Sequence, residues 1–385
     1  METLKLTEIN HAAEIRPNFA VMSEKLRIKL SKLKAISYAW LFMAVIFALV
    51  EHFTLTSTYS LGVVDGYTFQ TNLLFHLAST VIAISLGATF LVFFLEDRCR
   101  ERPYWFGIML IVIVYITVVS IITFLLGLVL VPLNTGILAD DPGFGEAYRA
   151  YLFDTVHIKN ILSWSVVVGF TQLLLQINDK FGHGVLWNLI RGKYHAAREE
   201  ERIFMFLDLK SSTATAEKLG NRLYHDFLRD YFADITNAIL YNKGQIYQYV
   251  GDEVVITWLK EDGVDDYHCL KCYFDIKTSI EKRRVKYEEK YGFIPEFKAG
   301  LHTGKVIAGE IGIIKRDITY SGDVLNTAAR IQSKCNELGV SILASESLLK
   351  LFSADMPFRK RPLGEIELRG KALKVSLSTF AMPQA

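Results

Sequence analysis

Four long apolar segments dominate the first half of the chain. They cover about residues 35–56, 72–95, 104–131 and 156–177, and they contain almost no charged side chains. Each is long enough to cross the hydrocarbon core of a bilayer, which takes about 20 residues of helix. Helices in the core of a soluble protein would be shorter and would carry a polar face. The pattern therefore predicts a four-helix transmembrane domain over residues 35–177, surrounded by the lipid bilayer.

The pattern changes after the fourth apolar segment. Residues 178–202 are polar, basic first and then acidic, and short strand-like runs then alternate with amphipathic helical stretches. This alternation is typical of an α/β domain. In the polar segment Trp187 and Tyr194 are seven residues apart, with Leu186 and Ile190 nearby, which predicts a short signalling helix that pairs with a second copy. We therefore divide the chain into an N-terminal segment (1–34), a transmembrane domain (35–177), a linker helix (178–202) and a soluble domain (203–385).

The distribution of charge between the apolar segments predicts the orientation of the chain. Residues 25–34 and 96–103 are rich in Lys and Arg, whereas 57–71 contain neither and 132–155 contain only Arg149. Because basic loops stay on the cytoplasmic side, both termini and the soluble domain are expected in the cytoplasm, below a plasma (inner) membrane. A mean hydropathy of +0.24 agrees with a membrane protein. The net charge of +2 gives no reason to expect a nucleic-acid partner.

A hairpin pattern in the soluble domain carries two carboxylates at its tip. The stretch YQYVGDEVVITW, residues 247–258, has apolar β-branched runs on both sides of Gly251 and Asp252. Asp252 could be an ordinary turn residue or a metal ligand. Glu253 follows it directly and points the other way in an extended segment, so we rank it behind Asp252.

A second carboxylate ends the strand-like run RIFMFLD. Asp208 is followed by Ser211 and Ser212, which suit the N-cap of a helix whose first N–H groups would face an anion. If the hairpin pairs with this strand, Asp208 and Asp252 face each other. Two carboxylates so placed can hold two Mg²⁺ ions. A turn residue at the strand end is the alternative for Asp208.

Two further segments bring amide and basic groups. In the stretch DITYSGDVLNTAARIQ, Asn326 and Arg330 are four residues apart and share one face of a helix. There, an arginine can contact phosphate oxygens, and an amide can orient a ribose or an attacking hydroxyl. Arg369 and Lys371 flank a glycine turn in ELRGK. A solvated helix surface and a solvated hairpin are the alternatives.

Five segments occur in the order and spacing of class III nucleotide cyclases. They are FLDLKSST, YVGDEVVITW, GLHTGKVIAGEIG, ITYSGDVLNTAARIQ and ELRGK, and the resemblance covers about residues 200–382. The resemblance implies an α/β, ferredoxin-like catalytic domain that works as a head-to-tail homodimer with active sites at the subunit interface. It also implies attack of the ribose 3′ oxygen of a nucleoside triphosphate on the α-phosphorus, with release of pyrophosphate.

The resemblance assigns roles to individual residues. Asp208 and Asp252 match the ligands of two Mg²⁺ or Mn²⁺ ions per active site. Asn326 and Arg330 match the pair that the opposite subunit supplies to the transition state. Lys371, or less closely Arg369, matches the region of the basic residue that holds the terminal phosphates, and Ser211 and Ser212 lie at the expected phosphate cradle.

Two positions that select the base depart from the common pattern. Members selective for adenine usually carry Lys three residues before the hairpin glycine, where this chain has Gln248, and the partner position is Thr319. Threonine there resembles a subgroup that generally makes cyclic AMP. A Gln amide can donate to adenine or accept from guanine. We therefore expect ATP as the substrate and keep GTP, and hence a guanylate cyclase, as the alternative.

The membrane half is either an anchor that helps dimerisation or a sensor. His52, His76 and His157 end or begin apolar segments near the expected outer face, with Glu51 and Asp154 close in sequence. They could bind a transition metal, haem or a quinone, or they could face headgroups and neighbouring helices.

Two other classes of protein compete with an enzyme. One is a membrane receptor whose cyclase domain binds nucleotide but is catalytically silent, and the intact Asp208, Asp252, Asn326 and Arg330 argue against it. The other is a channel with a nucleotide-sensing tail, which the nearly uncharged spans argue against.

Overall fold

The computed structural model describes residues 2–57, 68–95, 103–181, 191–314, 316–353, 356–371 and 374–382. The chain divides into two compact units. One comprises Lys25–Leu186, and the other Met1–Glu24 together with Trp187–Ala385. Each unit is described by itself below.

The first unit is helical and contains the apolar segments. Four of its helical stretches are long and apolar enough to cross a membrane, namely Lys29–Leu55, Phe69–Leu95, Trp105–Val129 and Phe144–Asn178. The second stretch includes two π-helical turns, and the first continues a helix that already runs through the N-terminal segment. The predicted transmembrane helices are therefore confirmed as helices, within a few residues at most ends. The elements are α1 (Glu2–Leu55), α2 (Phe69–Ala83), η1 (Ile84–Ala88), η2 (Leu91–Leu95), α4 (Tyr104–Thr135), α5 (Phe144–Leu152) and α6 (Thr155–Phe181).

Aromatic and small side chains hold these helices together. The rings of Trp40 on α1 and Trp164 on α6 meet edge to face at 6.0 Å, and Trp40 Nε1 donates to Thr171 Oγ1 at 3.0 Å. Ala44 and Ala88 are fully buried at the same core, where small side chains let helices approach closely.

The second unit is built on one mixed sheet. The strand order is β2-β3-β1-β4-β6-β8-β7, and β5 pairs with β4. Strand β1 lies between β3 and β4 and is antiparallel to both, whereas β4 and β6 are parallel. The strands are β1 (Arg198–Leu209), β2 (Gln245–Val250), β3 (Glu253–Leu259), β4 (Phe297–Ile311), β5 (Asp317–Ser321), β6 (Ile342–Ser345), β7 (Arg359–Ile366) and β8 (Val375–Ala381).

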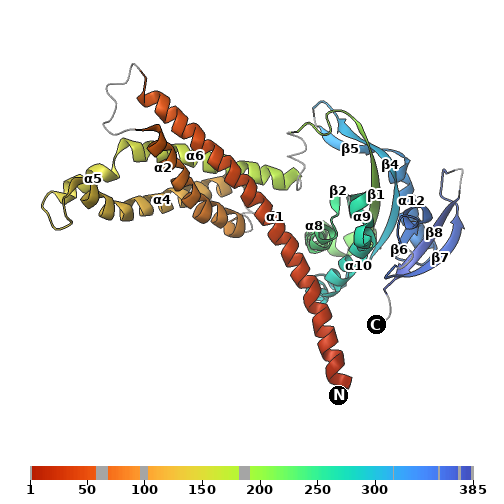
Figure 1. Cartoon of the computed structure of the whole chain (residues 1–385). Helices are drawn as coiled ribbons and strands as arrows, with labels where there is room; N and C mark the ends of the chain where they lie inside the picture. Colours follow the sequence, from red (N-terminus) through yellow and green to blue (C-terminus); the bar gives the residue numbers. More distant parts are fainter. Residues whose placement is uncertain are drawn as a thin grey trace. The chain divides into compact units, whose positions relative to one another are not determined.

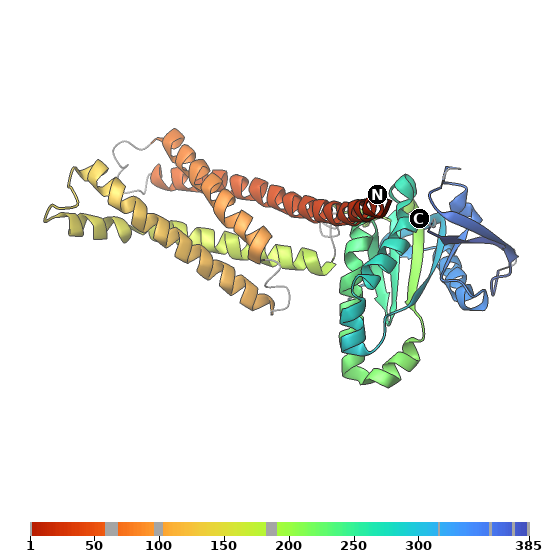
Figure 2. The same cartoon turned by 90° about the horizontal axis from the view of Figure 1, so that it is seen from below.

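Helices cover both faces of this sheet, as Figures 1 and 2 show. α8 and α10 pack on one face and α12 on the other, around separate apolar clusters. Alternation along β1 explains the division, because Ile203, Met205 and Leu207 face the first cluster while Phe204 and Phe206 face the second. The helices are α8 (Ser212–Tyr241), α9 (Lys260–Val264), η3 (Asp265–Tyr267), α10 (His268–Glu281), α11 (Arg284–Tyr291), α12 (Asp323–Glu337) and α13 (Glu346–Leu349).

The segment before the sheet differs from the predicted linker helix. Residues 182–190, which hold Trp187 and most of the predicted helix seam, lie outside the described part of the chain. Residues 191–197 form turns and a bend, and β1 already begins at Arg198. Tyr194 is 5% exposed, and its carbonyl accepts a hydrogen bond from the backbone N–H of Glu310. The expectation that Tyr194 lies on a helix surface was wrong, because this residue packs against the sheet instead.

Candidate active site

The structure brings the two predicted carboxylates together. β3 pairs with β1 so that Asp208 lies opposite Glu253, and β2 and β3 are joined by a two-residue turn of Gly251 and Asp252. Gly251 has a φ of 64°, the left-handed conformation that a glycine at the first position of such a turn adopts readily. Asp208 belongs to the alternation of Phe204 and Phe206, so its side chain points to the α12 face of the sheet.

The electrostatics of this pair fit a bound cation. Burial raises the pKa of Asp208, and the hydrogen bond and negative charge of Asp252 raise it further, while Lys298 lowers it. Oδ2 of Asp252 is buried and has no hydrogen-bond partner. A buried acceptor without a donor, next to a second carboxylate, is costly unless a positive ion satisfies it. Oxygen ligands of this kind are the ones that Mg²⁺ and Mn²⁺ prefer, so the residues present fit a divalent cation.

Two residues on other elements, which the sequence did not predict as site residues, contact the Asp208 carboxylate. Nζ of Lys298 on β4 lies 3.2 Å from Oδ2 of Asp208, and Nε2 of Gln332 on α12 donates to the same oxygen at 2.9 Å. In the β1–β4 register Lys298 lies opposite Asp208. This pairing cannot be predicted from the alternation of apolar and polar residues alone. Gln332 lies two residues after Arg330, at a position that reads as an ordinary helix residue.

Burial and the two aspartates also raise the pKa values of Glu253 and Tyr224. Burial raises the pKa of Glu253 to about 7, with further contributions from Asp208 and Asp252. Burial likewise raises the pKa of Tyr224 on α8, and the charge of Asp252 adds to that effect. The site is thus negative and partly shielded from water before any cation binds.

The start of α8 differs in detail from the predicted helix cap. Ser211 occupies the N-cap position with a φ of 55°, and its side chain makes no capping hydrogen bond. Ser211 is therefore at the predicted N-cap position, but its side chain does not cap the helix. Ser211, Ser212 and Thr215 line a cavity of about 280 Å³ at this helix start, together with Lys210 and Glu296.

Asn326 and Arg330 share α12, as predicted, and the ELRGK turn packs against them. Asn326 is exposed and Arg330 is half-buried. A Cβ on Gly370 would lie 3.4 Å from a terminal nitrogen of Arg330, so the turn touches the guanidinium. Nζ of Lys371 pairs with Oδ2 of Asp323, the first residue of α12. Arg369 is exposed in the same turn.

The two positions predicted to select the base lie next to a pair of tyrosines that contact each other. Gln248 lies on β2 directly after a bulge at Tyr247, and Thr319 lies on β5 directly before Tyr320. The rings of Tyr247 and Tyr320 meet at 5.0 Å with an interplanar angle of 65°. This contact holds β2 near β5, although β3, β1 and β4 separate them in the sheet.

The predicted residues form two groups within one chain. Asp208 and Asp252 make one group, and the α12 residues with the ELRGK turn make the other. Among the described residues no hydrogen bond or ion pair joins Asp208 or Asp252 to Asn326, Arg330 or Lys371.

The three histidines of the membrane half do not form one group. Nε2 of His76 lies 2.8 Å from Oε2 of Glu51, and Nζ of Lys159 pairs with the other oxygen of Glu51. The His52 ring instead packs at a tilt against Phe69, and the His157 ring meets Tyr151 edge to face. Within the described residues no group of three or more His, Cys, Asp or Glu side chains could hold a metal ion. The metal site predicted from these histidines is therefore not formed there.

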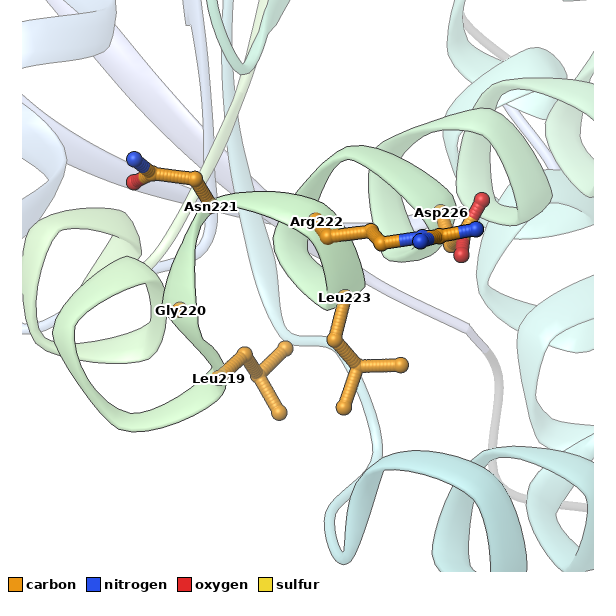
Figure 3. Close-up of a pocket in the computed structure, with 6 residues that line it drawn as sticks. All are labelled: Leu219, Gly220, Asn221, Arg222, Leu223 and Asp226. Atoms are coloured by element: carbon orange, nitrogen blue, oxygen red, sulfur yellow. The ribbon is translucent and has the colours of Figure 1, made fainter.

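A larger hollow lies away from all of these residues. Figure 3 shows the kink of α8 at Gly220, where Leu219 and Arg222 help to line a cavity of about 430 Å³. Gly220 adopts φ 71° and ψ 162°, which breaks the helix. None of the predicted site residues lines this cavity, so its size does not mark the active site.

Comparison with known proteins identifies the second unit. Residues 195–383 match the family model of the adenylate and guanylate cyclase catalytic domain. Adenylate cyclase 2 of Rhizobium meliloti is 36% identical over 219 residues, which are 57% of this chain and 60% of that protein. Adenylate cyclase 1 of the same organism is 26% identical over 187 residues, 47% of this chain and 28% of that protein. The chain thus spans only part of the length of either relative.

Solved structures were compared as well. The adenylyl cyclase CyaB from P. aeruginosa is 21% identical and covers 49% of this chain and 97% of its own, with a TM-score of 0.44. On the strength of the family match, residues 195–383 form a nucleotide cyclase catalytic domain. The predicted fold class is confirmed.

Proposed function

We propose that the protein is a membrane-bound adenylate cyclase, which converts ATP to 3′,5′-cyclic AMP and pyrophosphate. The observation that carries this proposal is the Asp208–Asp252 pair, with its buried, unpartnered oxygen, in a domain of the cyclase family. A silent nucleotide receptor would have no need for that unsatisfied carboxylate, which costs stability.

Asp208 and Asp252 would hold two divalent cations, Mg²⁺ or Mn²⁺. When bound, such cations lower the pKa of a coordinated hydroxyl and neutralise phosphate charge. Gln332 and Lys298 fix the direction of the Asp208 carboxylate, so the pair is oriented before a cation arrives.

The second group of residues would act on the substrate. In the reaction the ribose 3′ hydroxyl loses its proton to water, and its oxygen forms a bond to the α-phosphorus. The bond from the α-phosphorus to the oxygen that bridges to the β-phosphate breaks, and pyrophosphate leaves with the electron pair of that bond. Arg330 would stabilise the charge that develops on the α-phosphate, and Asn326 would orient the ribose. Lys371 would bind the terminal phosphates, for which it must exchange its pairing with Asp323.

A homodimer would complete each active site. One chain holds both groups, yet among its described residues no hydrogen bond or ion pair joins Asp208 or Asp252 directly to Asn326, Arg330 or Lys371. A second copy, placed head to tail, can bring Asn326 and Arg330 of one subunit to Asp208 and Asp252 of the other. Two equivalent sites would result.

Gln248 and Thr319 would bind the base of the nucleotide and select between adenine and guanine. Thr319 donates its hydroxyl to the carbonyl of Gly309 at 3.4 Å, a weak bond that a base could replace. The Gln248 amide is exposed and can turn either way, so GTP stays the second candidate substrate. The named cyclase relatives favour ATP.

Four membrane-spanning helices would place this activity at a membrane. By the positive-inside rule, the basic segments of the sequence would put the catalytic domain on the cytoplasmic side of a plasma (inner) membrane. Ligand binding at the outer face has no structural support from His52, His76 and His157 as a group. In that region Glu51 pairs with both His76 and Lys159.

Product formation tests the proposal. Full-length protein in detergent is given Mn²⁺ with ATP or GTP, and cyclic nucleotides are quantified. Cyclic AMP that disappears in Asp252→Asn, but persists in the control Asp265→Asn, supports the proposal; Asp265 is exposed and pairs with Lys243. Cyclic GMP alone would change the substrate, and no product from a folded dimer would favour a silent receptor.

A further inference from the structure

The strongest feature outside the catalytic groups is a buried arginine, Arg202 on β1. Its side chain is 1% exposed. Nε donates to Glu200 at 2.7 Å, Nη1 to Gln245 at 3.2 Å and Nη2 to the hydroxyl of Tyr194 at 3.5 Å. The guanidinium also lies over the ring of Tyr320, 4.6 Å from its centroid. A charge so far from water persists only when its partners are all in place.

The partners of Arg202 come from four parts of the domain. Glu200 is on β1 itself, Gln245 begins β2, Tyr320 is on β5, and Tyr194 belongs to the segment that precedes the sheet. β2 and β5 are the strands that carry Gln248 and Thr319. One rigid, planar group therefore contacts both strands.

A chain of aromatic contacts extends this link to the base-selecting positions. Tyr320 touches Arg202 on one side and Tyr247 on the other, and it also packs edge to face on Phe204 at 5.5 Å. Tyr320 directly follows Thr319, and Tyr247 directly precedes Gln248 in the bulge of β2. A shift of the guanidinium would thus change the separation of the two side chains that contact the base.

We propose that Arg202 is a positioning residue for base recognition: it holds β2 and β5 at the separation at which Gln248 and Thr319 together fit one purine. Tyr194 makes the segment before the sheet part of the same network. The inference rests on the proposed cyclase function. It adds a residue that touches neither base nor phosphate, and it makes substrate selectivity depend on the segment that leads to the membrane domain.

The experiment compares nucleotide selectivity in full-length protein. Arg202→Lys keeps the charge and loses the planar fork, and Tyr320→Leu removes the ring that the guanidinium covers. Each is expected to raise KM for ATP roughly tenfold, since a small misplacement of binding groups has effects of this size. The preference for ATP over GTP, measured as the ratio of kcat/KM or as GTP inhibition, should fall, with a smaller change in kcat. Tyr194→Phe should act in the same direction and more weakly.

A matched control separates positioning from stability. Tyr287→Phe removes a buried hydrogen bond to Asp234, 2.9 Å long, on the opposite face of the sheet. It should lower the melting temperature and leave the selectivity unchanged. Arg202→Lys and Tyr320→Leu variants that melt earlier but keep the wild-type KM and ATP-to-GTP ratio would overturn the inference. If Arg202→Lys does not fold, Tyr320→Leu alone decides. Wild-type protein without any product would instead reject the cyclase proposal.

Discussion

Nε2 of Gln332 donates a hydrogen bond to Oδ2 of Asp208 at 2.9 Å, and this bond joins α12 to the proposed metal site. The same helix carries Asn326 and Arg330. α12 lies in direct backbone contact with β4, because a Cβ on Gly300 would come within 2.2 Å of the backbone nitrogen of Gln332. The helix therefore places Gln332 with little freedom, and one element carries both Gln332 and the residues proposed to contact the substrate.

Gln332→Ala is expected to weaken metal binding. Without the amide, Asp208 loses a donor that fixes its direction, and loss of such a partner typically costs about 10- to 100-fold in metal affinity. Mn²⁺ titrations, followed by activity and by the rise in melting temperature, would measure it. Asn336→Ala removes an exposed amide from the same helix and serves as the control. Unchanged Mn²⁺ dependence in Gln332→Ala would show that the bond does not orient the site.

Asp252→Asn should stabilise the metal-free protein while it abolishes turnover. The substitution removes one of two neighbouring negative charges and supplies a donor for Asp208, which we expect to add up to about 1 kcal/mol. Activity should fall by at least about 100-fold, since the metal site is lost. Thermal unfolding in the presence of EDTA measures the first effect. A lower melting temperature than wild type would contradict the proposed repulsion between Asp208 and Asp252.

His302 should make the stability of the catalytic domain depend on pH. Burial first, and then the charge of Lys371, lower the pKa of His302 from 6.5 to about 4, while Nδ1 lies 2.7 Å from the hydroxyl of Ser345. Because the folded protein resists protonation of this ring, the stabilisation present above pH 6.5 is lost as the pH falls towards 4. His302→Gln should lose less stability over that window.

The control for that measurement is His225→Gln, because His225 is exposed on α8. It should follow the wild-type curve, in which protonation of carboxylates also contributes to unfolding in acid. If His302→Gln and wild type lose stability in parallel, His302 does not carry the effect.

In the membrane unit, Glu51 and Lys159 should be energetically coupled. Lys159→Met leaves the Glu51 carboxylate with His76 alone, and because the Lys159 side chain is exposed, loss of this pair is expected to cost up to about 1 kcal/mol. Adding Glu51→Gln should recover much of that loss. A double-mutant cycle measures this coupling. It compares the thermal stability of the wild type, the two single variants and the double variant in lipid nanodiscs. Strictly additive effects would show that the pair does not hold α1 to α6.

The sequence predicts local features well because they repeat along the chain. The apolar lengths predict the four membrane helices, and alternation along β1 puts Asp208 on the face of Phe204 and Phe206. The hairpin tip at Gly251 and Asp252 follows from its turn residues.

Contacts between distant segments could not be predicted in the same way. Gln332 reaches Asp208 across 124 positions, and Tyr247 meets Tyr320 only because the sheet brings β2 close to β5. The register that sets Lys298 opposite Asp208 leaves no local signal. The three histidines of the membrane half, which the sequence places at a similar depth, have different partners for the same reason. Likewise, the sequence predicts a helix at Tyr194, whereas the structure shows its hydroxyl in contact with the buried Arg202.

The most direct test of the central claim mixes two inactive variants. Asp252→Asn keeps the α12 group, Arg330→Ala keeps the metal group, and each homodimer should make no cyclic AMP. When the two full-length chains are co-expressed, half of the dimers are mixed, and each mixed dimer has one intact site. About a quarter of the wild-type activity should therefore return. No recovery in a mixture shown to contain heterodimers, or full activity of either variant alone, would contradict a cyclase with shared active sites.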